Sequence, residues 1–215
     1  MTYAIIMEIA ATGPIGLIAD SHGRLDLVRW ALGELTERGA SIVVHLGDLC
    51  DSLAPLALED AVDLVEQAGI VTVLGNNEYA VLEAHRNRHP NPLTLRVMAF
   101  LESLPYIVTM GEVTFAHSAP FPWPAALRWP VAEGAPPFRS RFAHRCRILF
   151  RGHSHTPSIL RMENGSWTGV HTGADGVYEL EKASTYVITV GALEKGAYAL
   201  YDPASETVRF LRLKS

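Results

Sequence analysis

Apolar and polar positions in the first third of the chain follow a strand–helix–strand pattern. Three short apolar runs rich in β-branched residues predict strands that are buried on both faces: residues 15–19, 42–46 and 70–74. Apolar residues at helical spacing predict a helix over 25–38, closed by Gly39, and a second helix over about 55–69 with Pro55 in its first turn. Strands that alternate with helices in this way predict that a parallel sheet begins the domain.

Short strands dominate the rest of the pattern. One more helix and three strands are predicted next, at about 92–104, 106–109, 113–116 and 148–150. Four later segments predict a second, mostly antiparallel sheet: 158–161, 186–190, 197–201 and 208–213. Two sheets stacked face to face with helices outside make an α/β (α+β) fold. Because the chain has 215 residues, we expect a single domain over 1–215, with 1–13 as an N-terminal extension.

Polar clusters follow several of these strands. The five clusters are Asp20-Ser21-His22, Gly47-Asp48-Leu49-Cys50-Asp51, Gly75-Asn76-Asn77-Glu78, His117 and Gly152-His153-Ser154-His155. The carboxyl ends of parallel strands form ligand crevices, so we expect the clusters to converge. Carboxylate, imidazole and amide donors without a thiolate pair suit hard or borderline divalent cations rather than a structural zinc ion. His45, inside a predicted strand, is interpreted as a packed histidine without a catalytic role.

Composition and charge narrow the classes of partner. The chain has 18 Lys and Arg against 23 Asp and Glu, a net charge of −5, which argues against extended nucleic-acid binding. The apolar stretch 113–132 contains four prolines and Arg128, so no membrane span is expected. The first basic residue is Arg24, which does not fit a secretory signal, and the only cysteines are Cys50 and Cys146. We therefore expect a cytoplasmic protein that does not bind membranes.

In order, the clusters read D-x-H, GD-x-x-D, GN-x-E, H and GH-x-H, which resembles the calcineurin-like metallophosphoesterase superfamily and, within it, a small prokaryotic phosphodiesterase-like branch. The resemblance implies a four-layer α-β-β-α sandwich in which helices flank two mixed sheets. It also implies two divalent metal ions with one shared ligand, Asp48. One ion would be held by Asp20, His22, Asp48 and His155, and the other by Asp48, Asn76, His117 and His153. Manganese is the preferred metal, while iron, zinc, nickel and magnesium stay open.

The same resemblance implies an activity. The chain would hydrolyse a phosphodiester or a nucleotide-like phosphoric ester, a small substrate, by attack of a hydroxide activated by the dinuclear centre. Asp48, Asn77 and Asp51 are the candidate catalytic residues, and Asp51 would orient metal ligands without binding the metal. Asn77 stands where most of the superfamily has the histidine that protonates the leaving oxygen, and an amide cannot donate that proton. Good leaving groups are therefore favoured, unless a histidine supplies the proton, for which the candidates are His85, His89 and His144.

Several alternatives stay open at this point. A phosphomonoesterase, acting on a protein or a dinucleoside polyphosphate, fits the same ligand set, and so does a non-catalytic interaction module on the same fold. A homo-oligomer is possible. The segment 120–138 is rich in Trp and Pro, and no regular structure is expected there. Its aromatic side chains either pack against the domain or stack on a substrate base, and packing is favoured: Phe121, Trp123 and Trp129.

Overall fold

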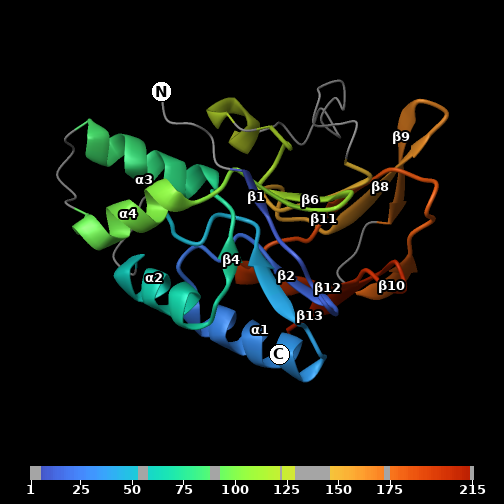
Figure 1. Ribbon diagram of the computed structural model, residues 1–215, viewed down its shortest axis with the longest axis horizontal. Coiled ribbons are helices and arrows are strands. Elements are labelled where there is room, and N and C mark those ends of the chain that lie inside the picture. Colours follow the sequence, from blue (N-terminus) through green and yellow to red (C-terminus); the bar gives the residue numbers. More distant parts are fainter. Residues whose placement is uncertain are drawn as a thin grey trace.

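The computed structural model describes residues 6–52, 58–87, 93–121, 123–128, 146–171 and 175–213. Two mixed β-sheets stack against each other and are flanked by helices, which confirms the expected fold class (Figure 1). The six-stranded sheet has, in spatial order, β10 (Gly176–Glu179), β13 (Thr207–Arg212), β12 (Ala197–Asp202), β2 (Ile15–Ile18), β3 (Ile42–His45) and β4 (Val71–Thr72). The seven-stranded sheet has β1 (Ile6–Glu8), β5 (Ile107–Met110), β6 (Val113–Ala116), β7 (Ile148–Arg151), β11 (Tyr186–Thr189), β8 (Ser158–Glu163) and β9 (Ser166–His171).

The main core fills the space between the sheets. Alternate residues of the central strands point into it, among them Leu17, Val44, Phe115 and Phe150, all fully buried. Because successive side chains of a strand point to opposite faces, Ile18 points the other way, toward the helices on the outer face of the six-stranded sheet. This two-sided burial explains why β2 and β3 read as continuous apolar runs in the sequence.

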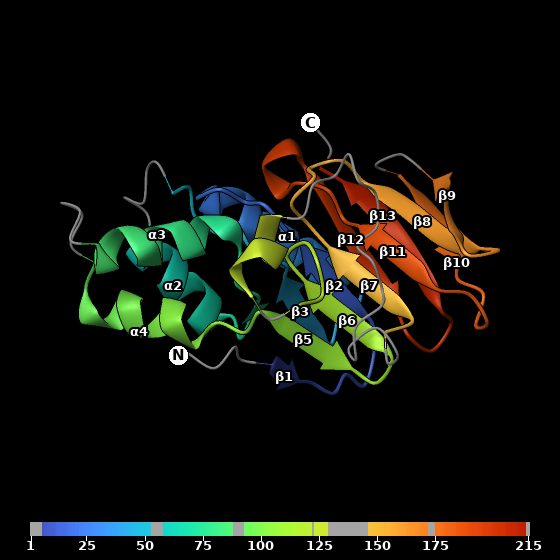
Figure 2. The same ribbon diagram turned by 90° about the horizontal axis from the view of Figure 1, so that it is seen from above.

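Two helices cover the outer face of the six-stranded sheet: α1 (Leu25–Glu37) and α2 (Leu58–Gln67). Helices α3 (Asn76–Arg86) and α4 (Leu95–Ser103) pack with α2 at one end of the molecule, and β8 and β9 lie at the other (Figure 2). The predicted start of α2 around Pro55 lies outside the described residues. Helix α3 was not predicted, because its first turn coincides with the polar cluster that follows β4. None of the described helices is both long and apolar enough to cross a membrane.

The prediction that the C-terminal strands form a sheet of their own is wrong. Strand β12 pairs antiparallel with β2, with Ala199 opposite Leu17, and so β12 and β13 extend the sheet that β2 begins. Strand β11 instead pairs with β7 and β8 in the seven-stranded sheet. The physical reason is burial on both faces: Tyr201 points into the core between the sheets and Tyr198 points toward α1, which suits a strand inside a helix-covered sheet.

Four more elements, β1, β9, β10 and η2, were not predicted. Residues 6–8, within the expected N-terminal extension, form β1, which pairs in parallel with β5 at the edge of the seven-stranded sheet. Strands β9 and β10 are the outermost strands of the two sheets at the other side. Residues Pro124–Arg128 form a short 3₁₀ helix, η2, within the segment where no regular structure was expected. The organisation of the chain as a single domain stays a prediction.

Candidate metal centre

The polar clusters converge at one end of the stacked sheets. Asp20 and Asp48 follow β2 and β3, and the amide N of His22 donates to the carbonyl O of Asp48 at 3.1 Å, which joins the two loops. His117 follows β6 in the other sheet, and its carbonyl O accepts a hydrogen bond from the amide N of Gly152, after β7, at 3.0 Å. The site is therefore built from strand ends of both sheets, as their positions in the sequence predict.

The backbone at this site is strained. Five of the seven predicted metal ligands have positive φ: Asp20 (51°), His22 (45°), Asp48 (56°), His153 (65°) and His155 (58°). Non-glycine residues seldom adopt this left-handed conformation, which costs free energy, and such residues cluster at functional sites. The tight turns after three strands direct these side chains toward one another, which no propensity pattern in the sequence could indicate.

One group of donor atoms comprises Asp20, His22 and His155, whose donor atoms all lie within 4.8 Å of one another. The Nε2 atoms of His22 and His155 are 3.3 Å apart, and His155 Nε2 is 3.5 Å from Asp20 Oδ1. Asp20 is fully buried, and its carboxylate accepts hydrogen bonds from the amide N of His153 at 2.9 and 3.2 Å. The Nδ1 of His155 lies 3.2 Å from Oε1 of Glu194, a residue that no sequence pattern marks as functional.

The second group comprises Asp20, Asp48 and His117, all buried, with donor atoms again within 4.8 Å. His117 Nδ1 is 2.8 Å from the carbonyl O of Leu46, so this nitrogen carries a proton and donates it. His117 Nε2 then faces the Oδ1 atoms of Asn76 at 3.0 Å and Asp48 at 3.5 Å. A histidine nitrogen and two oxygens that face one another at these distances are arranged as ligands around a shared cation would be. The donor set therefore fits a divalent cation.

Electrostatics keep two of the donors, Asp20 and His153, in forms that bind metal. Burial is the largest influence on Asp20 and raises its pKa, but the hydrogen bond with His155 and the charge of His117 outweigh it, so the net pKa is lowered. The His153 ring centroid lies 5.1 Å from that of His117, and burial lowers the pKa of His153 to about 4. At neutral pH Asp20 is therefore ionised and His153 is neutral, and both have electron pairs available for a cation.

The carboxylate of Glu78 joins the two loops that carry Asp48 and Asn76 by hydrogen bonds, a role that the sequence analysis did not predict. Its Oε2 accepts from the amide N of Asp48 at 2.9 Å and of Gly75 at 3.0 Å, and its Oε1 accepts from the amide N of Cys50 at 2.9 Å. The loops approach so closely that a Cβ at position 75 would lie 2.1 Å from the Asp48 nitrogen, so only glycine fits. The sequence did contain one indication of a role for Glu78, because it is the last residue of the GN-x-E motif.

Asn77 is bound to Asp48 by two hydrogen bonds. Its amide N donates to Asp48 Oδ1 at 2.9 Å, and its side-chain Nδ2 donates to Asp48 Oδ2 at 2.8 Å. Its Oδ1 accepts from the amide N of Ser52 at 3.2 Å. Asn77 is thus placed to position Asp48. Asp51 is half-buried in the same loop, and its orienting role stays a prediction.

Of the three histidines considered as proton donors, only His85 lies in the described part of the chain, and it lies away from the site. His85 lies on α3, nine residues after Asn76, which corresponds to about 14 Å along a helix. His89 and His144 lie outside the described residues.

The aromatic segment is only partly described. Phe121 is buried and stacks on Trp123 with ring centroids 4.6 Å apart, while Trp123 is 46% exposed. Phe121 therefore packs, as favoured, whereas Trp123 presents much of its ring to solvent. Trp129 lies outside the described residues.

His45 is fully buried, as expected for a packed strand histidine. Its Nε2 is 2.9 Å from Ser21 Oγ, which in turn donates to the carbonyl O of Leu49 at 3.2 Å. Burial lowers the pKa of His45 to about 3, so the ring is neutral at neutral pH. Its Nδ1 has no hydrogen-bond partner among the residues that the structure describes.

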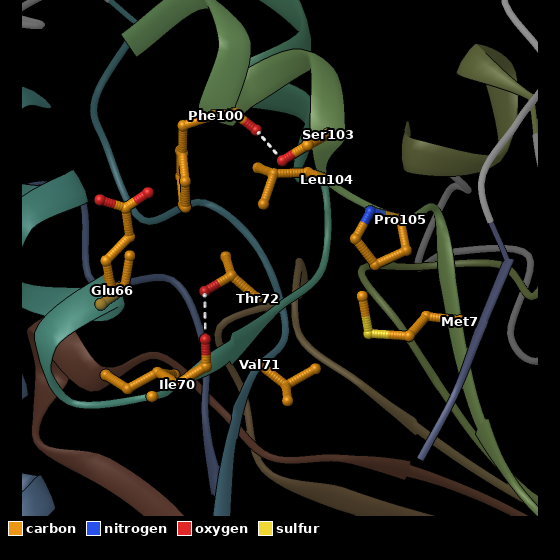
Figure 3. Close-up of a pocket in the computed structure, with 11 residues that line it drawn as sticks. Met7, Glu66, Ile70, Val71, Thr72, Phe100, Ser103, Leu104 and Pro105 are labelled. Carbon is orange, nitrogen blue, oxygen red and sulfur yellow. Dashed lines mark hydrogen bonds between the residues drawn. The ribbon is translucent and has the colours of Figure 1, made fainter. Parts of the chain in front are cut away.

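A separate pocket of about 320 Å³ lies between the ends of α2 and α4 and the edge strand β4 (Figure 3). Its lining includes Met7, Ile70, Phe100 and Leu104, and it contains none of the predicted metal ligands. Among the described residues that line this pocket, Glu66 alone carries a charge. An apolar pocket with a carboxylate has nothing to attract a phosphoric ester, so we assign the chemistry to the strand-end cluster.

The fold and the cluster together define a metallophosphoesterase. Residues 14–191 match the family model of the calcineurin-like phosphoesterase superfamily domain. The chain belongs to this superfamily and is a metal-dependent hydrolase of phosphoric esters.

Similar proteins are known in sequence and in structure. An uncharacterized protein of Methanocaldococcus jannaschii is 24% identical over 223 residues, which are 93% of this chain and 87% of that protein. The crystal structure of a metallophosphoesterase from Sphaerobacter thermophilus aligns with a TM-score of 0.72 and 24% identity, covering 94% of this chain and 88% of that one. A candidate diadenosine tetraphosphatase aligns with a TM-score of 0.61 and 16% identity, covering 99% and 100%. At these identities, the two structures support the fold alone.

Proposed function

We propose that this chain hydrolyses a phosphodiester or a nucleotide-like phosphoric ester at a dinuclear metal centre. Asp20, His22, Asp48 and His155 would hold one cation, and Asp48, Asn76, His117 and His153 the other. The observation that supports this most directly is that an imidazole nitrogen and a carboxylate oxygen face each other at 3.5 Å in each group: His155 Nε2 and Asp20 in one, His117 Nε2 and Asp48 in the other. When bound, the cations supply Lewis acidity toward the phosphate and activate a water molecule for attack.

The protein's own contribution is orientation. Asn77 holds both carboxylate oxygens of Asp48, and the amide N of His153 holds those of Asp20, so the two acidic ligands are fixed before any cation arrives. The carbonyl of Leu46 fixes the tautomer of His117. Fixed ligands lose little freedom on binding, which favours affinity and a defined distance between the cations.

The substrate class follows from Asn77. Its side chain is engaged with Asp48 and Ser52 and has no acidic proton, so it cannot protonate a leaving alkoxide. Loss of such an acid costs roughly 10²- to 10⁴-fold for a poor leaving group and much less for a good one. We therefore favour a diester or anhydride-like substrate whose leaving oxygen is weakly basic, as in nucleotides.

Metal identity and location complete the proposal. Three carboxylate or amide oxygen donors beside four imidazoles favour manganese over softer metals, although iron, zinc, nickel and magnesium suit the same donors. Cys50 and Cys146 are both unpaired thiols, which is compatible with a cytoplasmic location.

The test is metal content together with hydrolysis of bis-p-nitrophenyl phosphate and p-nitrophenyl phosphate, with and without added Mn²⁺. Wild type should bind about two ions per chain and cleave the diester faster when Mn²⁺ is added, and Asp48→Asn should lose both properties. Asp60→Asn, the same change at an exposed position of α2, is the matched control and should behave as wild type. Preference for the monoester would instead support a phosphomonoesterase, and wild-type protein that binds no metal would refute the proposal.

A further inference from the structure

A short turn between β11 and β12 brings Glu194 beside the predicted metal ligand His155. Residues Leu193–Lys195 form a single 3₁₀ turn, η5. Glu194 Oε1 lies 3.2 Å from His155 Nδ1, the ring nitrogen that does not face Asp20. A carboxylate can only accept here, so Nδ1 of His155 carries a proton, and Nε2 is the ring nitrogen that faces the site and is left to bind a cation.

The turn is attached to the site by its backbone. The amide N of Leu193 donates to the carbonyl O of Ala19 at 2.8 Å, and the amide N of Glu194 donates to the carbonyl O of Asp20 at 3.2 Å. At the start of the turn, Gly191 lies so close to Pro157 that a Cβ there would be 2.6 Å from the proline Cγ. The turn thus contacts both the Asp20 loop and the end of the histidine loop, so the position of Glu194 is determined by the fold and not by a flexible side chain alone.

The two predicted metal sites differ in what supports their histidines. His117 Nδ1 donates to a neutral carbonyl, that of Leu46, in the buried group. His155 Nδ1 faces an anionic carboxylate in the more exposed group. A carboxylate partner makes the opposite ring nitrogen a stronger electron-pair donor than a carbonyl partner does, and it adds negative charge near the cation. The more exposed group therefore has a charged partner behind one of its histidines, where the buried group has a neutral one.

We infer that Glu194 is a positioning residue for the metal ligand His155, which fixes its tautomer and strengthens its bond to the cation held with Asp20 and His22. The inference rests on the proposed metal centre. A role as a mere surface ion pair fits less well, because both side chains are mostly shielded, with exposures of 26% for His155 and 31% for Glu194, and because the turn is hydrogen-bonded to the Asp20 segment.

The test measures metal binding directly. Metal-free protein is titrated with Mn²⁺ by calorimetry and with Co²⁺ by visible absorption, for wild type, Glu194→Ala and Glu194→Gln. Glu194→Ala should weaken one of the two sites by roughly 10- to 100-fold and leave the other within about twofold, the usual effect of removing a carboxylate behind a histidine ligand. Glu194→Gln keeps a hydrogen-bond acceptor without the charge, so its affinity at the weakened site should lie between those of wild type and Glu194→Ala. Glu37→Ala, at the exposed end of α1, is the matched control.

A thermal melt of each metal-free variant separates positioning from folding. The melting temperature should be unchanged in Glu194→Ala, because the carboxylate acts on the cation through His155. If Glu194→Ala binds both cations with the same affinities as wild type, the inference is overturned while the metal centre stands. The inference is also overturned if the melting temperature of Glu194→Ala falls but neither site alone loses affinity. Wild-type protein that binds no cation would overturn both the inference and the centre.

Discussion

Replacing Glu78 by alanine should separate the two loops that carry Asp48 and Asn76. The side chain is fully buried and accepts three backbone hydrogen bonds, from the amides of Asp48, Cys50 and Gly75. Each buried donor that loses its acceptor costs about 1–3 kcal/mol, so three should lower the free energy of unfolding by at least about 3 kcal/mol even if water replaces part of the loss. That is a large fraction of the roughly 5–15 kcal/mol that stabilises a typical domain.

The assay is urea unfolding in excess chelator, followed by the same measurement with Mn²⁺. Glu83→Ala is the matched control, because Glu83 lies on the same helix in an exposed ion pair with Arg86. Exposed pairs contribute about 0–1 kcal/mol, so this variant should stay close to wild type. Glu78→Gln, which keeps the size of the side chain but has only one acceptor oxygen, should lie between the two. A loss below about 1 kcal/mol for Glu78→Ala would refute the reasoning, and Glu78→Gln allows the test if the alanine variant does not fold.

Two further predictions concern pH and charge. The pKa of His45 is lowered by burial to about 3 from 6.5, so the unfolded chain takes up the proton first as the pH falls, and stability is lost below about pH 6.5. His45→Gln should remove this loss, so the free energy of unfolding of wild type should fall by roughly 1.5 kcal/mol relative to that of the variant between pH 6.5 and 5. Urea unfolding at each pH measures this, with His85→Gln as the control. Free energies of unfolding that change equally with pH in wild type and His45→Gln would contradict the prediction. Asn77→Asp places a second carboxylate where Nδ2 now donates to Asp48 Oδ2 at 2.8 Å, so metal-free protein should lose about 2 kcal/mol and regain part of it with Mn²⁺. Equal thermal stability of Asn77→Asp and wild type in chelator would show that the predicted repulsion is absent.

Elements that depend on local pattern were predicted well. Strands β2 and β3 and helix α1 were located within one or two residues, because burial on both faces and a helical stripe are visible in a single stretch of sequence. The convergence of Asp20 and Asp48 followed from the same information, since the carboxyl ends of neighbouring parallel strands meet at one edge. The resemblance of five ordered clusters to a superfamily then indicated the chemistry, and the family match over 14–191 confirms the superfamily.

Pairing and conformation at a distance could not be read in this way. Nothing local indicates that β12 lies beside β2. The pairing of a strand depends on which arrangement buries both of its faces, and the two faces of β12 carry Tyr198 and Tyr201. The start of α3 at Asn76 was missed for a related reason. A polar cluster read as loop is also the first turn of a helix, and Glu78 satisfies nearby amides there.

The sequence by itself therefore determined the strands and helices with a clear local pattern, the class of the fold and the residue types at the strand ends, since each of these depends on neighbours along the chain. Only the tertiary structure decided how the donor atoms face one another. Contacts between distant segments produce the left-handed turns at Asp20 and Asp48. They also produce the hydrogen bond from Asn77 to Asp48 and the contact between Glu194 and His155. Their physical cause is the close packing of loops from two sheets, which imposes conformations that no isolated segment would adopt.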